Sequence, residues 1–170
     1  MEKPVSTRKI VYVALFTALN VILSSFSIPV PGGHLYLNDV AICFASLVFD
    51  PISAFVIGGV GAFLGDFLFY PAPMFVSLAT HGLQAVCISL IVGKKTSVPS
   101  IPRAILALVV GIIVMVTGYS LGRAFVYATP EYAIIKLPFE ILQAVIGAVV
   151  GSLIMYKTPL RRFILNIPKE

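Results

Sequence analysis

The sequence predicts an all-α integral membrane protein, a bundle of six transmembrane helices. Hydrophobic residues make up 59% of the chain and charged residues 11%, and the mean hydropathy is +1.03. Soluble domains carry about 25% charged residues, so this chain has too few charges to cover a water-facing surface. Its apolar residues also form runs close to the length of about 20 residues that crosses a bilayer. The lipid bilayer is therefore the expected solvent.

The apolar runs define a single transmembrane domain over residues 1–170. The first run follows a basic stretch and is longer than a signal-peptide core, so we expect a retained helix. The second run is short, and Asp50 can cap the next helix with Pro51 in its first position. Residues 28–39 contain two prolines, paired glycines and no Lys or Arg, which predicts a loop on the outer face. The expected helices cover residues 9–26, 40–49, 51–69, 74–92, 103–127 and 131–156.

The basic residues predict the topology. Most Lys and Arg lie at the two ends of the chain or in the loop at residues 93–103. Because basic loops stay on the cytoplasmic side, both termini are expected to be cytoplasmic. No basic stripe then remains for nucleic acid. Cys43 and Cys87 lie in apolar runs without a Cys/His cluster, so we expect no disulfide, metal site or cofactor.

Polar side chains inside the predicted spans gather in the outer half of the bundle. Such groups are costly in lipid and mark pockets or pathways. The sixth helix carries a stripe at residues 136, 140 and 143, and the fourth a similar one at 77, 81 and 84. The inner half has almost nothing comparable, which predicts a pocket open to the outside and closed below. The candidate binding residues are His34, Tyr36, Asn38, Asp39, Ser77, His81, Gln84, Tyr119, Arg123, Lys136, Glu140 and Gln143.

A structural role for these polar groups is the alternative. Lys136 could bridge to Glu140 along its own helix, and Arg123 could meet Asp66. Asp66 is the strongest candidate for a structural role, because it follows a glycine-rich run where helices pack closely. His34 is a lone loop histidine and a weak candidate for a metal ligand.

The layout resembles the substrate-binding S component of energy-coupling factor (ECF) vitamin transporters. The likeness rests on the chain length, the six expected helices, the Ala14-xxx-Ala18 pair in the first helix and the Gly-Pro-rich outer loop with Leu37-Asn38-Asp39. The run GGVGAFLGD at residues 58–66 adds to it. The resemblance covers nearly the whole chain, although each motif alone is weakly specific.

This resemblance implies a function and partners. A small vitamin would bind near the outer face, and Ala14 and Ala18 would dock on a membrane coupling (T) subunit driven by two ATP-binding subunits. Residues 93–96 (GKKT) lack the pattern of a P-loop, so energy has to come from such partners. The candidate side chains and the absence of Trp favour a small hydrogen-bonding ring, hydroxymethylpyrimidine or pyridoxine, over a flavin. Riboflavin, pantothenate and queuosine precursors remain open.

Two rival functions remain at this stage. Residues 118–122 (GYSLG) match G-x-S-x-G, and rhomboid-type proteases also have six helices with a Gly-flanked serine. Such an enzyme needs a later histidine to activate Ser120, and none follows it in the sequence. No catalytic residue is therefore predicted. A stand-alone transporter or channel would need polar lining through both halves of the bundle.

Overall fold

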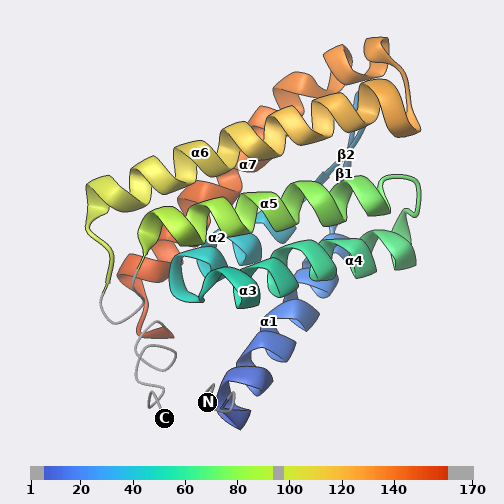
Figure 1. Ribbon diagram of the computed structural model, residues 1–170. Coiled ribbons are helices and arrows are strands. Elements are labelled where there is room, and N and C mark those ends of the chain that lie inside the picture. The colour runs from blue at the N-terminus through green and yellow to red at the C-terminus, as the bar shows by residue number, and fades with distance from the viewer. Residues whose placement is uncertain (1–5, 94–97, 161–170) are drawn as a thin grey trace.

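The computed structural model describes residues 6–93 and 98–160 as a helical bundle (Figure 1). Five helical segments are long and apolar enough to cross a membrane, and a shorter apolar helix lies among them. This confirms the predicted all-α membrane fold. The elements in chain order are α1 (Thr7–Ser25), β1 (Ser27–Val30), β2 (Gly33–Tyr36), α2 (Asn38–Val48), α3 (Pro51–Phe55), η1 (Val56–Val60), α4 (Gly61–Phe69), α5 (Met74–Val92), α6 (Ile101–Gly122), η2 (Arg123–Tyr127) and α7 (Pro130–Lys157).

The short helix α2 is the centre of the bundle. It packs against α7, α1 and α5, and every one of its residues except Val40 is buried. A helix that is apolar on all sides is stable when other helices surround it. This position explains why α2 is shorter than the surrounding spans, since its ends need not reach both surfaces of a bilayer.

The spans Pro51–Phe69 and Ile101–Tyr127 each contain a π-helical turn, η1 and η2. At η1, the Asn20 side chain from α1 donates to the carbonyl of Ile57 at 2.6 Å. Asn20 and Ser24 also lie directly against Gly61 and Gly65, where any added Cβ would meet them at 2.6 and 2.5 Å. The glycine-rich run therefore lets the polar face of α1 approach closely. The sequence did not indicate either π-helical turn.

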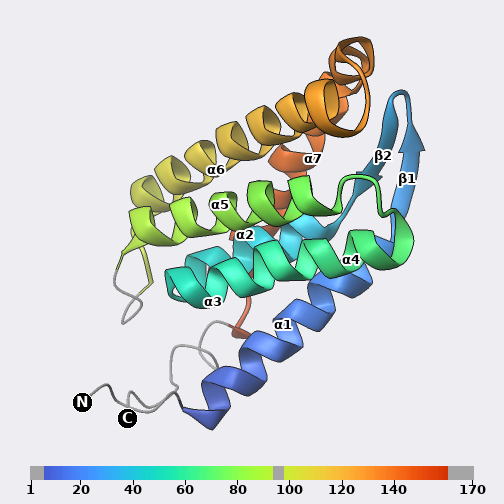
Figure 2. The same cartoon turned by 45° about the vertical axis from the view of Figure 1, so that its right-hand side comes forward.

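A β-hairpin stands where the sequence predicted an outer loop. β1 and β2 pair antiparallel, with Val30 opposite Gly33, and the hairpin projects from one end of the bundle in Figure 2. Gly32 and Gly33 have φ values of +79° and +149°, which are strained for other residues. α2 starts at Asn38 rather than at residue 40, so the chain passes from the hairpin into α2 almost without a loop.

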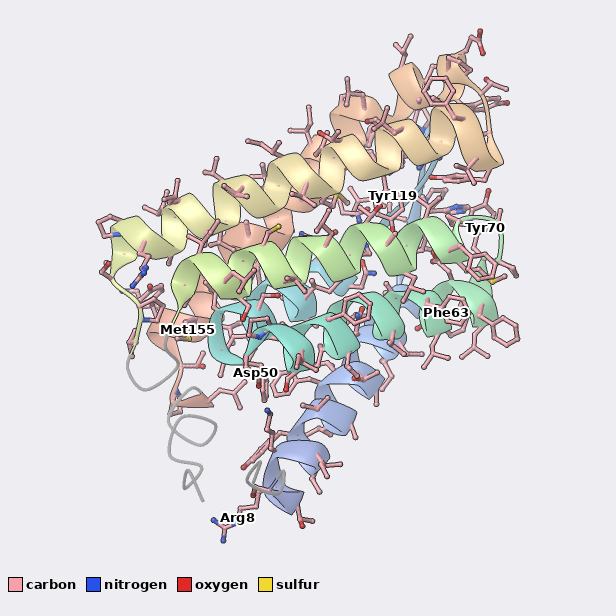
Figure 3. The ribbon with its side chains drawn as sticks, viewed as in Figure 1. Arg8, Asp50, Phe63, Tyr70, Tyr119 and Met155 are labelled. Carbon is pink, nitrogen blue, oxygen red and sulfur yellow. The ribbon has the colours of Figure 1, made fainter. Side chains whose placement is uncertain are left out.

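The opposite end of the bundle is filled with apolar side chains. Phe16 packs there against Phe44 and Phe49, whose ring centroids lie 5.4 and 5.5 Å from its own, and Ile88 and Met155 are fully buried in the same cluster. In Figure 3, Met155 lies far from Tyr70 and Tyr119. The polar half and the apolar half predicted from the sequence are thus distinct regions of the fold.

Asp50 caps α3 at the apolar end. Its carboxylate accepts from the Ser53 backbone N–H at 3.2 Å and from the Ser53 hydroxyl at 2.8 Å, and Lys9 Nζ lies 2.8 Å away. Partial burial opposes ionisation, but the hydrogen bonds from Lys9 and Ser53 outweigh it and lower the pKa of Asp50. The pair ties the first turn of α1 to the start of α3.

Candidate functional site

A small cavity lies beneath the hairpin at the polar end of the bundle. Its volume is about 30 Å³, room for one or two water molecules. The hairpin, the ends of α4 and α5, and residues of α6, η2 and α7 surround it, and Tyr70 and Tyr119 mark this region in Figure 3. The lining residues are Gly33, His34, Tyr36, Asn38, Asp66, Tyr70, Pro73, His81, Tyr119, Arg123, Tyr127, Glu140 and Gln143.

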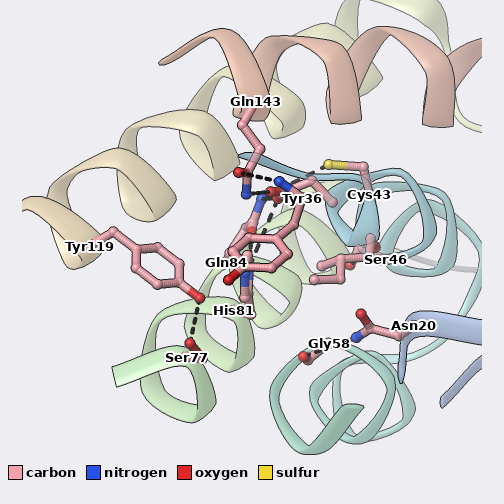
Figure 4. Close-up of polar contacts among 12 residues, drawn as sticks. Asn20, Tyr36, Cys43, Ser46, Gly58, Ser77, His81, Gln84, Tyr119 and Gln143 are labelled. Atoms are coloured by element: carbon pink, nitrogen blue, oxygen red, sulfur yellow. Dashed lines mark hydrogen bonds and ion pairs between the residues drawn. The ribbon is translucent and has the colours of Figure 1, made fainter. Parts of the chain in front are cut away.

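A buried carboxylate anchors the floor of the cavity. Asp39 is 1% exposed, and its two oxygens accept from Gln84 Nε2 at 3.0 Å and from Gln143 Nε2 at 2.8 Å. Gln84 Oε1 lies 2.7 Å from His81 Nδ1, and Gln143 Oε1 accepts from the Tyr36 backbone N–H at 2.9 Å. Figure 4 shows Gln84, His81 and Gln143 close to Tyr36. The network connects the hairpin to α2, α5 and α7.

A group of charged side chains forms one wall. Arg123 Nη2 lies 2.8 Å from Glu140 Oε1, and Arg123 Nη1 donates to the carbonyl of Gly32 at 2.9 Å. The Arg123 guanidinium also lies 5.3 Å from the centre of the Tyr127 ring. Lys136 Nζ is 3.9 Å from the same Glu140 oxygen, beyond hydrogen-bond distance. Two cations therefore share one carboxylate at the point where the hairpin turn meets α7.

Hydroxyl groups form the opposite wall. The Tyr119 hydroxyl donates to Ser77 Oγ at 2.6 Å, and the Ser77 hydroxyl donates to Asp66 Oδ2. The Tyr119 ring meets the His81 ring edge to face, with centroids 5.1 Å apart. Arg123 does not join this chain of hydroxyls, because it pairs with Glu140. The Arg123–Asp66 contact considered under the structural alternative is therefore not formed.

The structure brings the candidate binding residues together, although four do not reach the cavity surface. Asp39, Ser77, Gln84 and Lys136 lie behind the wall, where they bond or adjoin the lining side chains. The other eight candidates line the cavity: His34, Tyr36, Asn38, His81, Tyr119, Arg123, Glu140 and Gln143. Burial raises the pKa of the Tyr36 phenol well above its ordinary value, and nearby Asp66 adds to the shift, so the phenol is neutral.

Sequence reasoning missed five lining residues. Asp66, assigned there to a structural role, both bonds Ser77 and lines the cavity. Tyr127 lies one turn after Arg123, a spacing that could have indicated it. Tyr70 and Pro73 belong to the turn between α4 and α5, and only the fold brings them to the hairpin, where the Tyr70 and His34 rings lie 6.0 Å apart. The fifth residue is Gly33.

Among the residues that the structure describes, the G-x-S-x-G serine has no catalytic partner. Ser120 Oγ is buried and has no hydrogen-bond partner within residues 6–93 and 98–160. His81 Nδ1 is hydrogen-bonded to Gln84, and residues 118–122 form the end of helix α6 and not the strand-to-helix turn that the motif needs. Within the described part of the chain, no cluster of three or more His, Cys, Asp or Glu is placed to hold a metal ion.

A second hollow lies along α1, the most exposed of the five long spans, with 17% of its window buried. The hollow has a volume of about 620 Å³ and runs between α1 and the Pro51–Phe69 span, and Ala14 and Ala18 are part of its lining. Lys9 and Asp50 border one end of it. Both alanines are exposed, so α1 presents a small-residue face to its surroundings.

The comparisons with known proteins agree with this architecture. A family model described as "ECF-type riboflavin transporter, S component" matches residues 4–160. The chain belongs to the ECF S-component family. It is a membrane protein of a transport system, the subunit that binds substrate, rather than an enzyme.

Two further proteins are similar to this S component. An uncharacterised protein of Pyrococcus woesei is 34% identical over 127 residues, which cover 74% of this chain and 83% of that protein. A solved structure described as the S component of a bacterial ECF transporter matches with a TM-score of 0.75 and 20% identity, covering 92% of this chain and 96% of that one. That structure supports the fold. S components of this family work with T and ATP-binding subunits, whereas the hydroxymethylpyrimidine or pyridoxine type predicted from sequence is not confirmed.

Proposed function

We propose that this S component captures a planar ring vitamin, riboflavin in the first instance, in the cavity beneath the β1–β2 hairpin. The description of the matching family supports the choice of riboflavin. The observation that carries the site is a set of buried polar atoms without hydrogen-bond partners among the described residues. Three of them belong to residues that line this cavity, Asn38 Oδ1, Arg123 Nε and Tyr127 Oη, and a fourth, Lys136 Nζ, lies behind its wall.

Unpartnered atoms of this kind point to a ligand. A buried donor or acceptor without a partner costs about 1–3 kcal/mol, and more when it is charged. Native proteins keep few of them unless water, an ion or a ligand meets them. Of the six such side-chain atoms in the described residues, four lie at or next to one cavity. A polar solute bound there would supply the hydrogen bonds that these atoms lack.

The aromatic side chains suit a ring. Tyr36, Tyr70, Tyr119 and Tyr127 line the cavity together with His34 and His81. Aromatic pairs prefer offset-stacked or edge-to-face geometry with centroids about 4.5–7 Å apart. A planar heterocycle placed among these rings would gain such contacts, while the unpartnered atoms bond its heteroatoms.

The small volume implies that the hairpin moves when the vitamin enters. A cavity of about 30 Å³ is far below the roughly 300–1,000 Å³ typical of ligand pockets. The hairpin is held by the Arg123–Gly32 and Gln143–Tyr36 hydrogen bonds, so their release would open the cavity. Because a smaller ring needs less displacement, hydroxymethylpyrimidine and pyridoxine are the second candidates.

The exposed face of α1 is the proposed docking site for the T subunit. Small residues such as Ala14 and Ala18 let another helix approach closely in a membrane, and the hollow beside them has room for large side chains. Two ATP-binding subunits would drive the complex, and the whole bundle, residues 1–170, would tilt to release the vitamin inside. In this account both termini are cytoplasmic, because Lys and Arg gather at the two ends of the chain and basic segments stay on the cytoplasmic side.

A binding assay tests the proposal. The purified chain in detergent is heated with riboflavin, pyridoxine or hydroxymethylpyrimidine, since a ligand of the folded state raises the apparent melting temperature. We expect riboflavin to raise it, and Lys136→Met to abolish the rise, because Lys136 Nζ is buried behind the cavity wall without a hydrogen-bond partner among the described residues. The matched control is Lys9→Met, which changes a lysine at the opposite end. If no vitamin of the panel raises the melting temperature of the wild type, the proposal fails.

A further inference from the structure

The hydrogen bonds around Asp39 run in one direction, from the side-chain amides to the carboxylate. An ionised carboxylate accepts hydrogen bonds and cannot donate them. Both amides that reach Asp39 therefore turn their NH₂ groups toward it, Gln84 at 3.0 Å and Gln143 at 2.8 Å. The backbone N–H of Tyr36 independently requires the oxygen of Gln143 to face the hairpin. The orientation of both amides follows from their neighbours.

This direction determines which nitrogen of His81 carries a proton. Because Gln84 gives its NH₂ group to Asp39, its oxygen is the atom that faces His81 Nδ1, 2.7 Å away. An amide oxygen only accepts, so Nδ1 has to be the N–H of the imidazole. The hydrogen bond made by one ring nitrogen in this way sets the role of the other.

The second nitrogen of His81 is then free to accept. The His81 side chain is 1% exposed, it lines the cavity, and Nε2 has no hydrogen-bond partner among the described residues. Asp39 Oδ1 is 3.8 Å from Nδ1, beyond hydrogen-bond distance, and already accepts from Gln84. A neutral ring with its proton on Nδ1 has an acceptor at Nε2 for whatever enters the cavity.

We propose that His81 selects for a hydrogen-bond donor on the ligand, an N–H or O–H on its ring system, and that Asp39 and Gln84 are the positioning residues that hold His81 in this acceptor form. The proposal rests on the cavity being the vitamin site, and it specifies what the vitamin must offer there. A ring with only acceptors at this position would leave Nε2 unpaired and bind more weakly.

The state of the imidazole can be measured without any ligand. The sequence contains two histidines, so the His34→Gln variant, purified through a tag without histidine and labelled with ¹⁵N-histidine, reports on His81 alone. We expect Nδ1 to show the ¹⁵N shift of a protonated ring nitrogen and Nε2 that of an unprotonated one at neutral pH. A protonated Nε2, in the other tautomer or in the imidazolium, overturns the proposal.

The role of Asp39 is tested by Asp39→Asn. An asparagine can donate as well as accept, so it no longer dictates how Gln84 is turned, and we expect both His81 tautomers to appear. Ser89→Ala is the matched control on α5, because Ser89 bonds the carbonyl of Phe49 rather than this network. If Asp39→Asn folds and keeps a single tautomer, the positioning role of Asp39 is overturned. If Asp39→Asn does not fold, the tautomer of His81 measured with Asp39 in place still decides whether Nε2 is an acceptor.

A pair of ligands separates this proposal from the proposed function. Riboflavin carries one ring N–H, and its N3-methyl analogue lacks it. We expect the methylated analogue to bind at least tenfold more weakly, and only riboflavin to shift the Nε2 resonance. Equal binding with an unmoved Nε2 resonance overturns donor selection by His81 while the vitamin site stands. If neither riboflavin nor the smaller vitamins bind, the proposed function fails and donor selection fails with it.

Discussion

Arg123 and Glu140 form an ion pair at the polar end of the bundle, with Nη2 2.8 Å from Oε1. The other terminal nitrogen of the same guanidinium donates to the carbonyl of Gly32 in the hairpin turn. One side chain thus joins the hairpin to α7 and η2. Because Arg123 is only 9% exposed, solvent screens this pair little.

Arg123→Lys should weaken both the fold and the binding of vitamin. A lysine ammonium is a single point donor and cannot reproduce the two directed contacts of a guanidinium. We expect a lower apparent melting temperature and an affinity about 10- to 100-fold weaker, which corresponds to ~1.4–2.8 kcal/mol. Arg103→Lys is the control, since Arg103 bonds the carbonyl of Ile91 far from the cavity. Equal effects of the two variants would contradict the role given to Arg123.

Gly147→Ala should destabilise the α2–α7 contact. A Cβ at Gly147 would lie 2.4 Å from Cβ of Asp39 and 2.9 Å from its carbonyl carbon, so α2 and α7 would have to separate. Overpacking of this kind costs about 1–3 kcal/mol. Displacing Asp39 would also disturb its bonds to Gln84 and Gln143, so we expect weaker binding of vitamin in a titration.

The control for Gly147→Ala is Val149→Ala on the same helix. Val149 is 51% exposed and faces lipid, so the change should alter stability by about 0.5 kcal/mol or less. Thermal melts in detergent give both values. A Gly147→Ala protein as stable as the Val149→Ala protein would show that the helices adjust without cost.

The Lys9–Asp50 pair makes stability depend on pH. The folded state lowers the pKa of Asp50, so its contribution is present above the unfolded value of about 3.9 and is lost as pH falls through the lower folded value. Asp50→Asn keeps the helix cap but removes the charge. We expect the wild type to melt higher than this variant at pH 7, with the difference shrinking toward zero below about pH 4. A difference that stays constant across this range would contradict the ion-pair account.

Ala14→Leu combined with Ala18→Leu should separate docking from capture. The larger side chains fill the hollow beside α1 and leave the cavity beneath the hairpin untouched. We expect unchanged binding of vitamin, but loss of co-purification with the T subunit and of vitamin uptake in cells. Val109→Leu, at a position 46% exposed on α6, is the control and should retain both. If the double variant still assembles and transports, the docking surface lies elsewhere.

The long helices could be predicted from the sequence because a bilayer strongly restricts the backbone conformation of an apolar segment. Within a bilayer every N–H and C=O has to bond internally, so long apolar runs become helices. The hairpin had no comparable signal. Ser-Ile-Pro-Val at β1 lacks a clean alternation of apolar and polar residues, and its pairing with β2 depends on support from Arg123 and Gln143. The π-helical turn η1 likewise depends on tertiary contact with Asn20.

The candidate site was predicted through its helical stripes. Residues 136, 140 and 143 share a face at helical spacing, and so do 77, 81 and 84, and the fold turns both stripes toward the cavity region. Tyr70 could not be found this way, because it lies in a turn and meets His34 only after folding. The sequence could not identify the ion-pair partner of Arg123 either, since Glu140 and Asp66 are equally plausible until the helices are placed.

The central claim is that the cavity beneath the hairpin binds the vitamin. Its most direct test is an isothermal titration of the purified chain with riboflavin, in parallel for the wild type, Lys136→Met and Val109→Leu. The account predicts saturable one-to-one binding by the wild type and Val109→Leu, and at least a tenfold loss for Lys136→Met. Riboflavin binding that is equally tight in all three proteins would show that the vitamin is held elsewhere and would contradict the account.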